Sequence, residues 1–221
     1  MIFTAKAILF DMDGVLVDSA SAVERVWRAW ATEYGYDPER VVAQAHGRRS
    51  IETIRELAPH LDPERENLRV EQMEIEDKDG VVPLPGAAEL LRNLPLGRFA
   101  IVTSATHALA EARLGFAGLP IPPRFIGGDD VVHGKPSPEP YLKGATLLGF
   151  TPDECLVFED APAGIAAARA AGMRVIALHT TCPARELKGA DAVLASLAEV
   201  KMQFHEGIIT LHADTVCVQE S

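Results

Sequence analysis

The sequence predicts an α/β protein: a parallel β-sheet with helices on both faces, and an all-helical segment inserted after the first strand. Short apolar runs alternate with helical patterns from residue 87 to residue 178, which is typical of parallel strands joined by crossover helices. One more apolar run, residues 6–10, is separated from this array by a segment with helical periodicity. We therefore predict a core domain of residues 1–17 and 83–221 and a helical cap domain of residues 18–82.

The first strand and the insertion have clear patterns. "KAILF" is short, apolar and bounded by charge, so it predicts a buried strand that ends at Asp11. From Ser19 apolar residues recur at helical spacing until Gly35, a residue that favours helix termination. This stripe includes Trp27 and Trp30, which we expect to pack in a core. Further helices are predicted at about 38–45, at 50–58 with Ser50 as N-cap, and at 63–77.

The remaining elements follow in alternation. Helices are predicted at residues 87–94, 107–115, 138–149 and 163–172, and strands at residues 98–104, 124–128, 154–160 and 174–178. The C-terminal segment "VKMQFHEGIITLHA" predicts two strands around Glu206 and Gly207, and it carries no recognisable chemistry.

Composition and charge exclude several classes of protein. The chain has 221 residues and a formal net charge of −11, and its Lys and Arg residues are scattered, so nucleic acid and anionic membranes are not expected partners. The cysteines Cys155, Cys182 and Cys217 are too far apart in sequence to indicate a disulfide framework or a zinc site. No apolar stretch approaches the length of a bilayer-spanning helix. We expect a soluble cytoplasmic protein, either a monomer or a weak dimer.

Polar residues follow three of the predicted strands, at the sheet edge where α/β proteins bind ligands. The first strand leads directly into Asp11 and Asp13, the strand at 98–104 ends in Thr103 and Ser104, and the strand at 154–160 ends in Glu159 and Asp160. Lys135 precedes a helix that begins near a proline. If these ends converge, four carboxylates, an ammonium group and a hydroxyl group share one pocket.

Such a pocket requires a cation. Two carboxylates about 4 Å apart repel by roughly 4 kcal/mol at an effective dielectric constant near 20. All the candidate ligands are hard oxygens, which favour Mg²⁺. With the metal and Lys135 holding a phosphate, Asp11 can attack phosphorus as the nucleophile and Asp13 can act as general acid and base. Asp18 lies outside this pair and is expected to cap the following helix.

The motifs "DMDGVLVDS", "VTSA", "HGKPSPEP" and "VFEDAPAGI" resemble, in order and spacing, the four signature motifs of the haloacid dehalogenase superfamily of phosphotransferases. The resemblance implies a Rossmann-like core with Asp11 as the phosphorylated nucleophile and Asp13 as acid and base. It also implies that Ser104, Ala105 and Lys135 bind the phosphoryl group. Mg²⁺ would be held by Asp11, the Asp13 carbonyl and Asp160, with Glu159 either a direct ligand or one step removed.

The cap segment "HGRRSIETI" resembles the substrate loop of bacterial sugar phosphatases and of 2-deoxyglucose-6-phosphate and glycerol-phosphate phosphatases. The resemblance implies a small phosphorylated substrate, a sugar or polyol phosphate. The candidate substrate-binding residues of the loop are His46, Gly47, Arg48 and Arg49; both arginines are equally compatible with solvated charges at a helix start.

Two alternative functions remain open at this stage. A phosphosugar mutase resembling β-phosphoglucomutase would carry a histidine on the first cap helix and a lysine in the cap loop, where this chain has Val23 and His46. A signalling receiver module also uses a phospho-accepting aspartate with a hydroxyl group and a lysine. A receiver, however, carries its acceptor on a middle strand and has no helical insertion.

Overall fold

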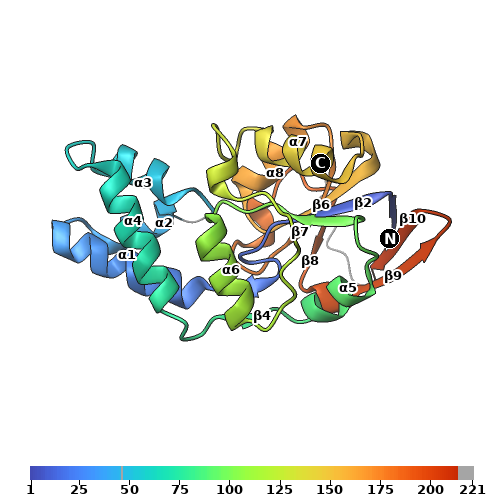
Figure 1. Ribbon diagram of the computed structural model, residues 1–221, viewed down its shortest axis with the longest axis horizontal. Helices are drawn as coiled ribbons and strands as arrows, with labels where there is room; N and C mark the ends of the chain where they lie inside the picture. The colour runs from blue at the N-terminus through green and yellow to red at the C-terminus, as the bar shows by residue number, and fades with distance from the viewer. Residues whose placement is uncertain (46, 214–221) are drawn as a thin grey trace.

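The computed structural model describes residues 1–45 and 47–213, and the predicted α/β fold is confirmed. Its central sheet has five strands in the order β5-β2-β6-β7-β8, and every neighbouring pair is parallel (Figure 1). The strands are β5 (Phe99–Ile101), β2 (Ala7–Phe10), β6 (Cys155–Glu159), β7 (Arg174–Leu178) and β8 (Ala192–Leu194).

Helices cover both faces of this sheet. Side chains of β2 alternate between the faces: Ile8 and Phe10 belong to one hydrophobic cluster, and Ala7 and Leu9 belong to another. The first cluster contains side chains of α5 (Ala87–Asn93) and α6 (His107–Phe116), and also Ala22 from the inserted helical segment. The second contains side chains of α7 (Glu139–Leu148) and α8 (Pro162–Ala170). The sheet is thus buried on both faces, as near-continuous apolar strands require.

The inserted helices form a separate layer beside the sheet, at the left of Figure 1. They are α1 (Ala20–Tyr34), α2 (Pro38–Ala45), α3 (Ser50–Leu57) and α4 (Pro63–Glu76). They have their own hydrophobic cluster, in which Trp27 and Trp30 are almost fully buried, so the core role predicted for both tryptophans is confirmed. The two ends of the helical block meet in a short antiparallel pair, β3 (Val17–Asp18) with β4 (Val82–Pro83).

A second sheet lies at the end of the core that is remote from the helical block (Figure 1). Its strands, in the order β1-β10-β9, are antiparallel: β1 (Ile2–Ala5), β10 (Ile208–Ala213) and β9 (Val200–His205). The two predicted C-terminal strands are therefore confirmed. Strand β1 was not predicted, because its partner is about two hundred residues away in the sequence and only tertiary pairing supplies its hydrogen bonds.

Two local predictions were wrong. Residues 124–128 do not form a strand: only Ile126 makes a bridge, to Val102, and the chain then turns into a 3₁₀ segment. Ser50 is the first residue of α3 rather than its N-cap, and Arg49 occupies the cap position. Short 3₁₀ segments occur at Gly128–Asp130 (η1), Pro152–Glu154 (η2), Ala184–Glu186 (η3) and Leu197–Glu199 (η4).

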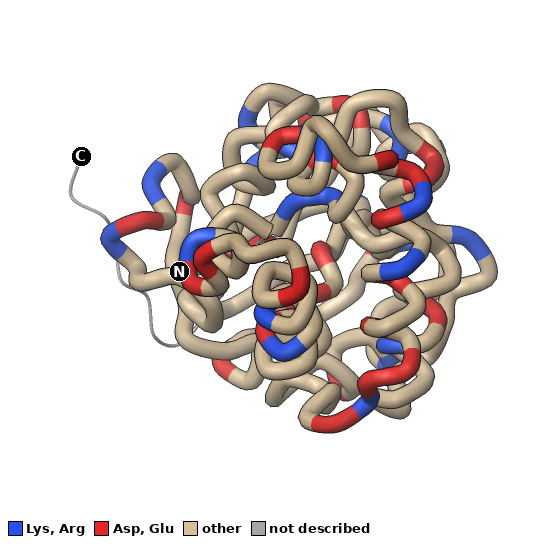
Figure 2. Tube along the Cα trace, turned by 90° about the vertical axis from the view of Figure 1, so that its left-hand side faces the viewer, with Lys and Arg blue, Asp and Glu red and all other residues tan. Residues whose placement is uncertain are grey.

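The described part of the chain includes no helix with the length and apolar character needed to cross a bilayer. Figure 2 shows Lys and Arg residues interspersed with Asp and Glu along the trace in that view. The expectation that nucleic acid is not a partner stays a prediction. Cys217 lies outside the described residues, whereas Cys155 and Cys182 are free thiols.

Candidate active site

The predicted polar residues gather at the carboxyl edge of the central sheet. Asp11 follows β2 directly, and its N–H donates to the Phe158 carbonyl of the neighbouring strand at 3.0 Å. Ser104 lies beyond β5 and Asp160 beyond β6, and both line the same cavity as Asp11. Parallel register brings the three strand ends together, so residues more than fifty positions apart share one site.

Lys135 is a buried cation beside Asp11. Its Nζ lies 3.0 Å from Asp11 Oδ1 and 2.6 Å from Glu159 Oε1, and its side chain is almost fully buried. A buried ammonium group is tolerated only when carboxylates surround it, so these two acids hold the lysine in its charged form. The predicted convergence of Asp11, Glu159 and Lys135 is thus seen directly.

Glu159 is fully buried, and both of its oxygens are occupied by protein donors. Oε1 accepts hydrogen bonds from Lys135 Nζ and from the Tyr141 hydroxyl, both at 2.6 Å. Oε2 accepts from the N–H groups of Asp160 at 3.0 Å and Ala161 at 3.3 Å. The carboxylate lies against α8 where a Cβ on Gly164 would be 1.7 Å from Oε1, so only glycine leaves room for it. Glu159 therefore orients Lys135.

The charges of the site perturb one another strongly. Burial raises the pKa of Asp11 well above its usual range; Lys135 opposes this effect, and the carboxylates of Glu159 and Asp160 add to it. Burial by itself would lower the pKa of Lys135, but Asp11 and Glu159 outweigh it and the pKa is raised. Burial also raises the pKa of Tyr141, which keeps its hydroxyl a neutral donor to Glu159. Such perturbation is common where carboxylates take part in catalysis.

The carboxylates provide a donor set that fits a divalent metal. Asp11, Glu159 and Asp160 are all buried, and one oxygen of each lies within 4.8 Å of the others. All three donors are hard oxygens, as Mg²⁺ prefers. Glu159 accepts four hydrogen bonds, and Asp160 Oδ2 accepts one from the Thr181 hydroxyl.

Asp13 has partners that the sequence did not reveal. Its Oδ1 accepts from the Ser19 hydroxyl at 2.6 Å, and its Oδ2 lies 2.8 Å from Nη1 of Arg113. Arg113 is on α6 and is itself buried; its Nη2 lies 3.3 Å from Oε2 of Glu74 on α4. Burial raises the pKa of Glu74 to about 7, although the charge of Arg113 opposes the shift. Asp18 was predicted to cap α1, but Ser19 occupies the N-cap position; Asp18 Oδ1 does accept from the N–H of Ala20, the first residue of the helix, at 3.2 Å.

A cavity of about 300 Å³ opens above Asp11, between the sheet edge and the inserted helices. Its walls carry both polar and apolar groups: Asp13, Val23, Glu24, Trp27, Val42, Gly47, Arg48, Ser50, Glu74, Ser104, Ala105, Arg113 and Thr181. The cavity therefore joins the candidate chemical groups to residues of the cap segment.

The predicted cap-loop residues divide between the cavity and the core. Gly47 lines the cavity and its carbonyl accepts from the Ser104 hydroxyl at 3.3 Å. Arg48 also lines the cavity and pairs with Glu56 at 2.8 Å. Arg49 does not line it: its guanidinium donates to the Gly128, Val131 and Val132 carbonyls of the core at 2.8–3.2 Å. His46 lies outside the described residues.

Sequence reasoning missed Arg113, Glu74 and Tyr141. A signal was available for two of them, because each is a charged residue on the buried face of its helix. Arg113 lies beside Leu109 and Leu114 on the apolar face of α6, and Glu74 is one turn from the buried Val70 on α4. A charged residue in an apolar stripe predicts a buried partner, but the identity of the partner requires the fold.

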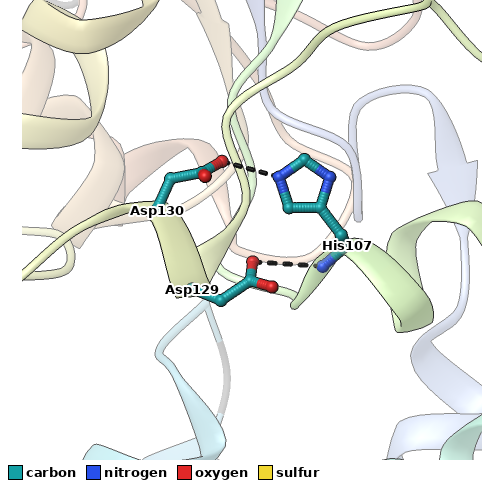
Figure 3. Close-up of side chains that lie close together, drawn as sticks. All are labelled: His107, Asp129 and Asp130. Atoms are coloured by element: carbon teal, nitrogen blue, oxygen red, sulfur yellow. Dashed lines mark hydrogen bonds and ion pairs between the residues drawn. The ribbon is translucent and has the colours of Figure 1, made fainter.

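A second group of potential metal ligands lies outside the cavity. Figure 3 shows His107 at the start of α6 facing Asp129 and Asp130. Asp129 Oδ1 accepts from the backbone N–H of His107 at 3.1 Å, and Asp130 Oδ2 lies 2.7 Å from His107 Nε2. Asp130 Oδ2 also accepts from Gly127 N at 2.8 Å. These bonds fix the loop around η1 against α6, so the cluster has a structural explanation.

The fold and the carboxylate–lysine site are typical of proteins that accept a phosphoryl group on an aspartate, and the family comparison identifies the class. Residues 5–172 match the model of the haloacid dehalogenase-like hydrolases. The chain belongs to this family, and the predicted membership is confirmed. Hydrolases of this family use a divalent metal, which agrees with the donor set of the site.

Similar proteins agree with this assignment. The chain is 44% identical to hexitol phosphatase A of Escherichia coli strain K12, over 88% of this chain and 93% of that protein. It is 35% identical to glycerol-1-phosphate phosphohydrolase 2 of Saccharomyces cerevisiae, over 89% of this chain and 84% of that protein. Among solved structures, CbbY of Rhodobacter sphaeroides in complex with phosphate has a TM-score of 0.75 and 27% identity, covering 88% of this chain and 96% of that one.

Proposed function

We propose that this chain is a Mg²⁺-dependent phosphatase that hydrolyses phosphomonoesters of small sugars or polyols, with Asp11 as the nucleophile. The observation that carries the proposal is that the Asp11 carboxylate lines the cavity and that its Oδ1 lies 3.0 Å from Nζ of the buried Lys135. An ammonium group in this place can hold a phosphate dianion beside a carboxylate that would otherwise repel it.

The metal would be held by the side chains of Asp11 and Asp160 and by the backbone carbonyl of Asp13. When bound, it supplies positive charge that offsets the repulsion between the carboxylates and the phosphate. Glu159 does not coordinate the metal directly, because its oxygens accept hydrogen bonds from Lys135, Tyr141 and two backbone N–H groups. Ser104, Ala105 and Lys135 bind the non-reacting phosphoryl oxygens.

The reaction proceeds in two displacements. Asp11 forms a bond to phosphorus while the ester bond breaks, and Asp13 gives its proton to the leaving alcohol oxygen. Asp13 then takes a proton from a water molecule that attacks the phosphorus. Inorganic phosphate leaves and the Asp11 carboxylate is regenerated.

The cavity supports a small substrate. Its volume of about 300 Å³ is at the lower end of the range of small-molecule sites. Polar groups of Glu24, Arg48 and Ser50 line the side contributed by the cap segment, where they can bind hydroxyl groups. The names of the bacterial and yeast relatives, a hexitol phosphatase and a glycerol-1-phosphate phosphohydrolase, support a substrate of the same class.

We also propose that residues 18–82 are a cap domain that hinges at the β3–β4 pair. Both connections to the core pass through this pair, and Gly14 and Gly86 nearby have positive φ angles of 75° and 87°. The separate hydrophobic cluster of the helical block supports movement as a unit. Closure would exclude water from the phosphoryl group.

The mutase alternative is disfavoured by Val23. Its side chain lines the cavity at the position where a mutase would carry a histidine, and an aliphatic group cannot transfer a proton. The receiver alternative is disfavoured because residues of the inserted helices line the cavity beside Asp11, and a receiver has no such insertion. Asp11 follows β2, which is an inner strand of the sheet, as the acceptor of a receiver also would. The position of its strand therefore does not distinguish a phosphatase from a receiver.

The test is phosphate release from a panel of sugar and polyol phosphates with Mg²⁺ present. We expect rapid turnover of at least one substrate by the wild type and none by Asp11→Asn, which keeps the shape of the side chain but removes the nucleophile. If Asp11→Asn retained a tenth of the wild-type kcat, the nucleophile would be misassigned. Isomerisation without phosphate release would favour the mutase.

A further inference from the structure

Arg113 connects the proposed acid–base group to the cap segment. Its Nη1 lies 2.8 Å from Asp13 Oδ2, and its Nη2 lies 3.3 Å from Glu74 Oε2. Asp13 belongs to the core, whereas Glu74 is on α4 of the inserted block, which packs against α6. One guanidinium group therefore binds a carboxylate from each side of the cavity.

Both charged side chains of this bridge are buried, so each needs an oppositely charged partner. The exposed fractions are 5% for Arg113 and 4% for Glu74. A buried guanidinium without a partner is strongly unfavourable, and its planar fork can bind two carboxylates in one fixed orientation. Glu74 therefore restricts where Arg113 can lie, and Arg113 in turn restricts where the Asp13 carboxylate can lie.

The Asp13 carboxylate is then held by two donors that approach different oxygens. Ser19 donates to Oδ1 at 2.6 Å, and Arg113 donates to Oδ2 at 2.8 Å. Ser19 immediately precedes α1, and Arg113 depends on α4. Both supports of Asp13 are therefore tied to the inserted helices.

We propose that Arg113 is a positioning residue for Asp13 and that Glu74 holds Arg113 in place, so that the acid–base group is correctly aimed only while α4 and α6 are packed together. The inference rests on the proposed function, since it assigns Asp13 to proton transfer. Proton transfer requires hydrogen-bond reach of about 2.6–3.2 Å, so a small displacement of the carboxylate costs activity.

The test compares two substrates of similar shape that differ in their need for an acid. Phenyl phosphate releases a basic phenolate and requires protonation, whereas p-nitrophenyl phosphate releases a weakly basic anion. The quantity measured is kcat/KM with Mg²⁺, which reports the step that transfers the phosphoryl group to Asp11. We expect Glu74→Gln to lower kcat/KM for phenyl phosphate about tenfold more than for p-nitrophenyl phosphate.

Glu71→Gln is the matched control. Glu71 lies one turn earlier on α4 and also reaches the core, but its carboxylate accepts from the Thr106 hydroxyl at 3.2 Å. The chemical change is the same and the helix is the same, and Arg113 keeps both of its carboxylate partners. We expect this variant to retain the wild-type ratio of the two substrates.

Arg113→Lys provides a second, independent variant, because an ammonium group keeps the charge but cannot fork between Asp13 and Glu74. We expect it to shift the substrate ratio in the same direction as Glu74→Gln. Thermal unfolding shows whether either variant has lost its fold. If one has, the substrate ratio is measured on the other. Wild-type ratios in the folded variants, or equal losses in Glu74→Gln and Glu71→Gln, overturn the inference. A wild type inactive on both aryl phosphates and on the sugar phosphates instead refutes the proposed function.

Discussion

Gly164→Ala should both destabilise the protein and inactivate it, although alanine is the better helix former. Gly164 is within α8, where replacement of glycine by alanine would normally gain about 1 kcal/mol. Here the new Cβ would lie 1.7 Å from Oε1 and 2.4 Å from Oε2 of Glu159. Because the carboxylate cannot stay in place, it must leave some of its four donors.

The size of the effect follows from those donors. Each hydrogen bond to a charged group contributes about 1.5–3 kcal/mol, so the loss of two of the four costs about 3–6 kcal/mol. After the helix gain is subtracted, we expect a net loss of about 2–5 kcal/mol in the free energy of unfolding. Activity should fall as well, since Lys135 loses the partner that orients it.

Urea denaturation and phosphate release measure the two effects. Gly115→Ala in α6 is the matched control, because no atom lies within 4 Å of the position its Cβ would take. We expect this control to be as stable as the wild type or more stable, by up to about 1 kcal/mol. If Gly164→Ala were equally stable and active, the structural account of the Glu159 site would be wrong.

Three further predictions concern the metal, pH and the cap loop. EDTA should abolish phosphate release and added Mg²⁺ should restore it, while Tm rises with Mg²⁺ concentration because the folded state alone binds the metal; full activity in EDTA would contradict the metal proposal. Backbone N–H groups of Val132 and His133 lower the pKa of Glu139 from 4.5 to about 2, so its stabilising effect is present above pH 4.5 and is lost as pH falls towards 2. The Tm difference between the wild type and Glu139→Gln should shrink over that window, and a constant difference would argue against this role. Arg48→Ala should lower kcat/KM for a sugar phosphate more than for p-nitrophenyl phosphate, whereas Arg49→Ala should lower both equally because Arg49 binds core carbonyls; the opposite pattern would assign substrate recognition to Arg49.

Periodicity and motif order in the sequence predicted much of the fold. The helices of the insertion were predicted to within a residue or two, because amphipathic stripes and, for the first helix, the terminating Gly35 are local signals. Four of the five parallel strands, β2, β5, β6 and β7, were predicted because they are buried on both faces and read as apolar runs, whereas the three-residue β8 (Ala192–Leu194) was not predicted. The position of Asp11 after β2 and of Asp160 after β6 followed from those strand ends.

Only the tertiary structure decided how charged residues pair across the site. Nothing local distinguishes Arg48 from Arg49, yet one lines the cavity and the other binds the core. The bridge from Asp13 through Arg113 to Glu74 joins three elements far apart in the chain, and β1 finds its partner in β10 at the opposite end. Sequence patterns indicate which face of a helix or strand is buried. They do not indicate which oppositely charged residue will compensate a buried charge, because that depends on which side chains the tertiary packing brings together. That partner is a property of the packing alone.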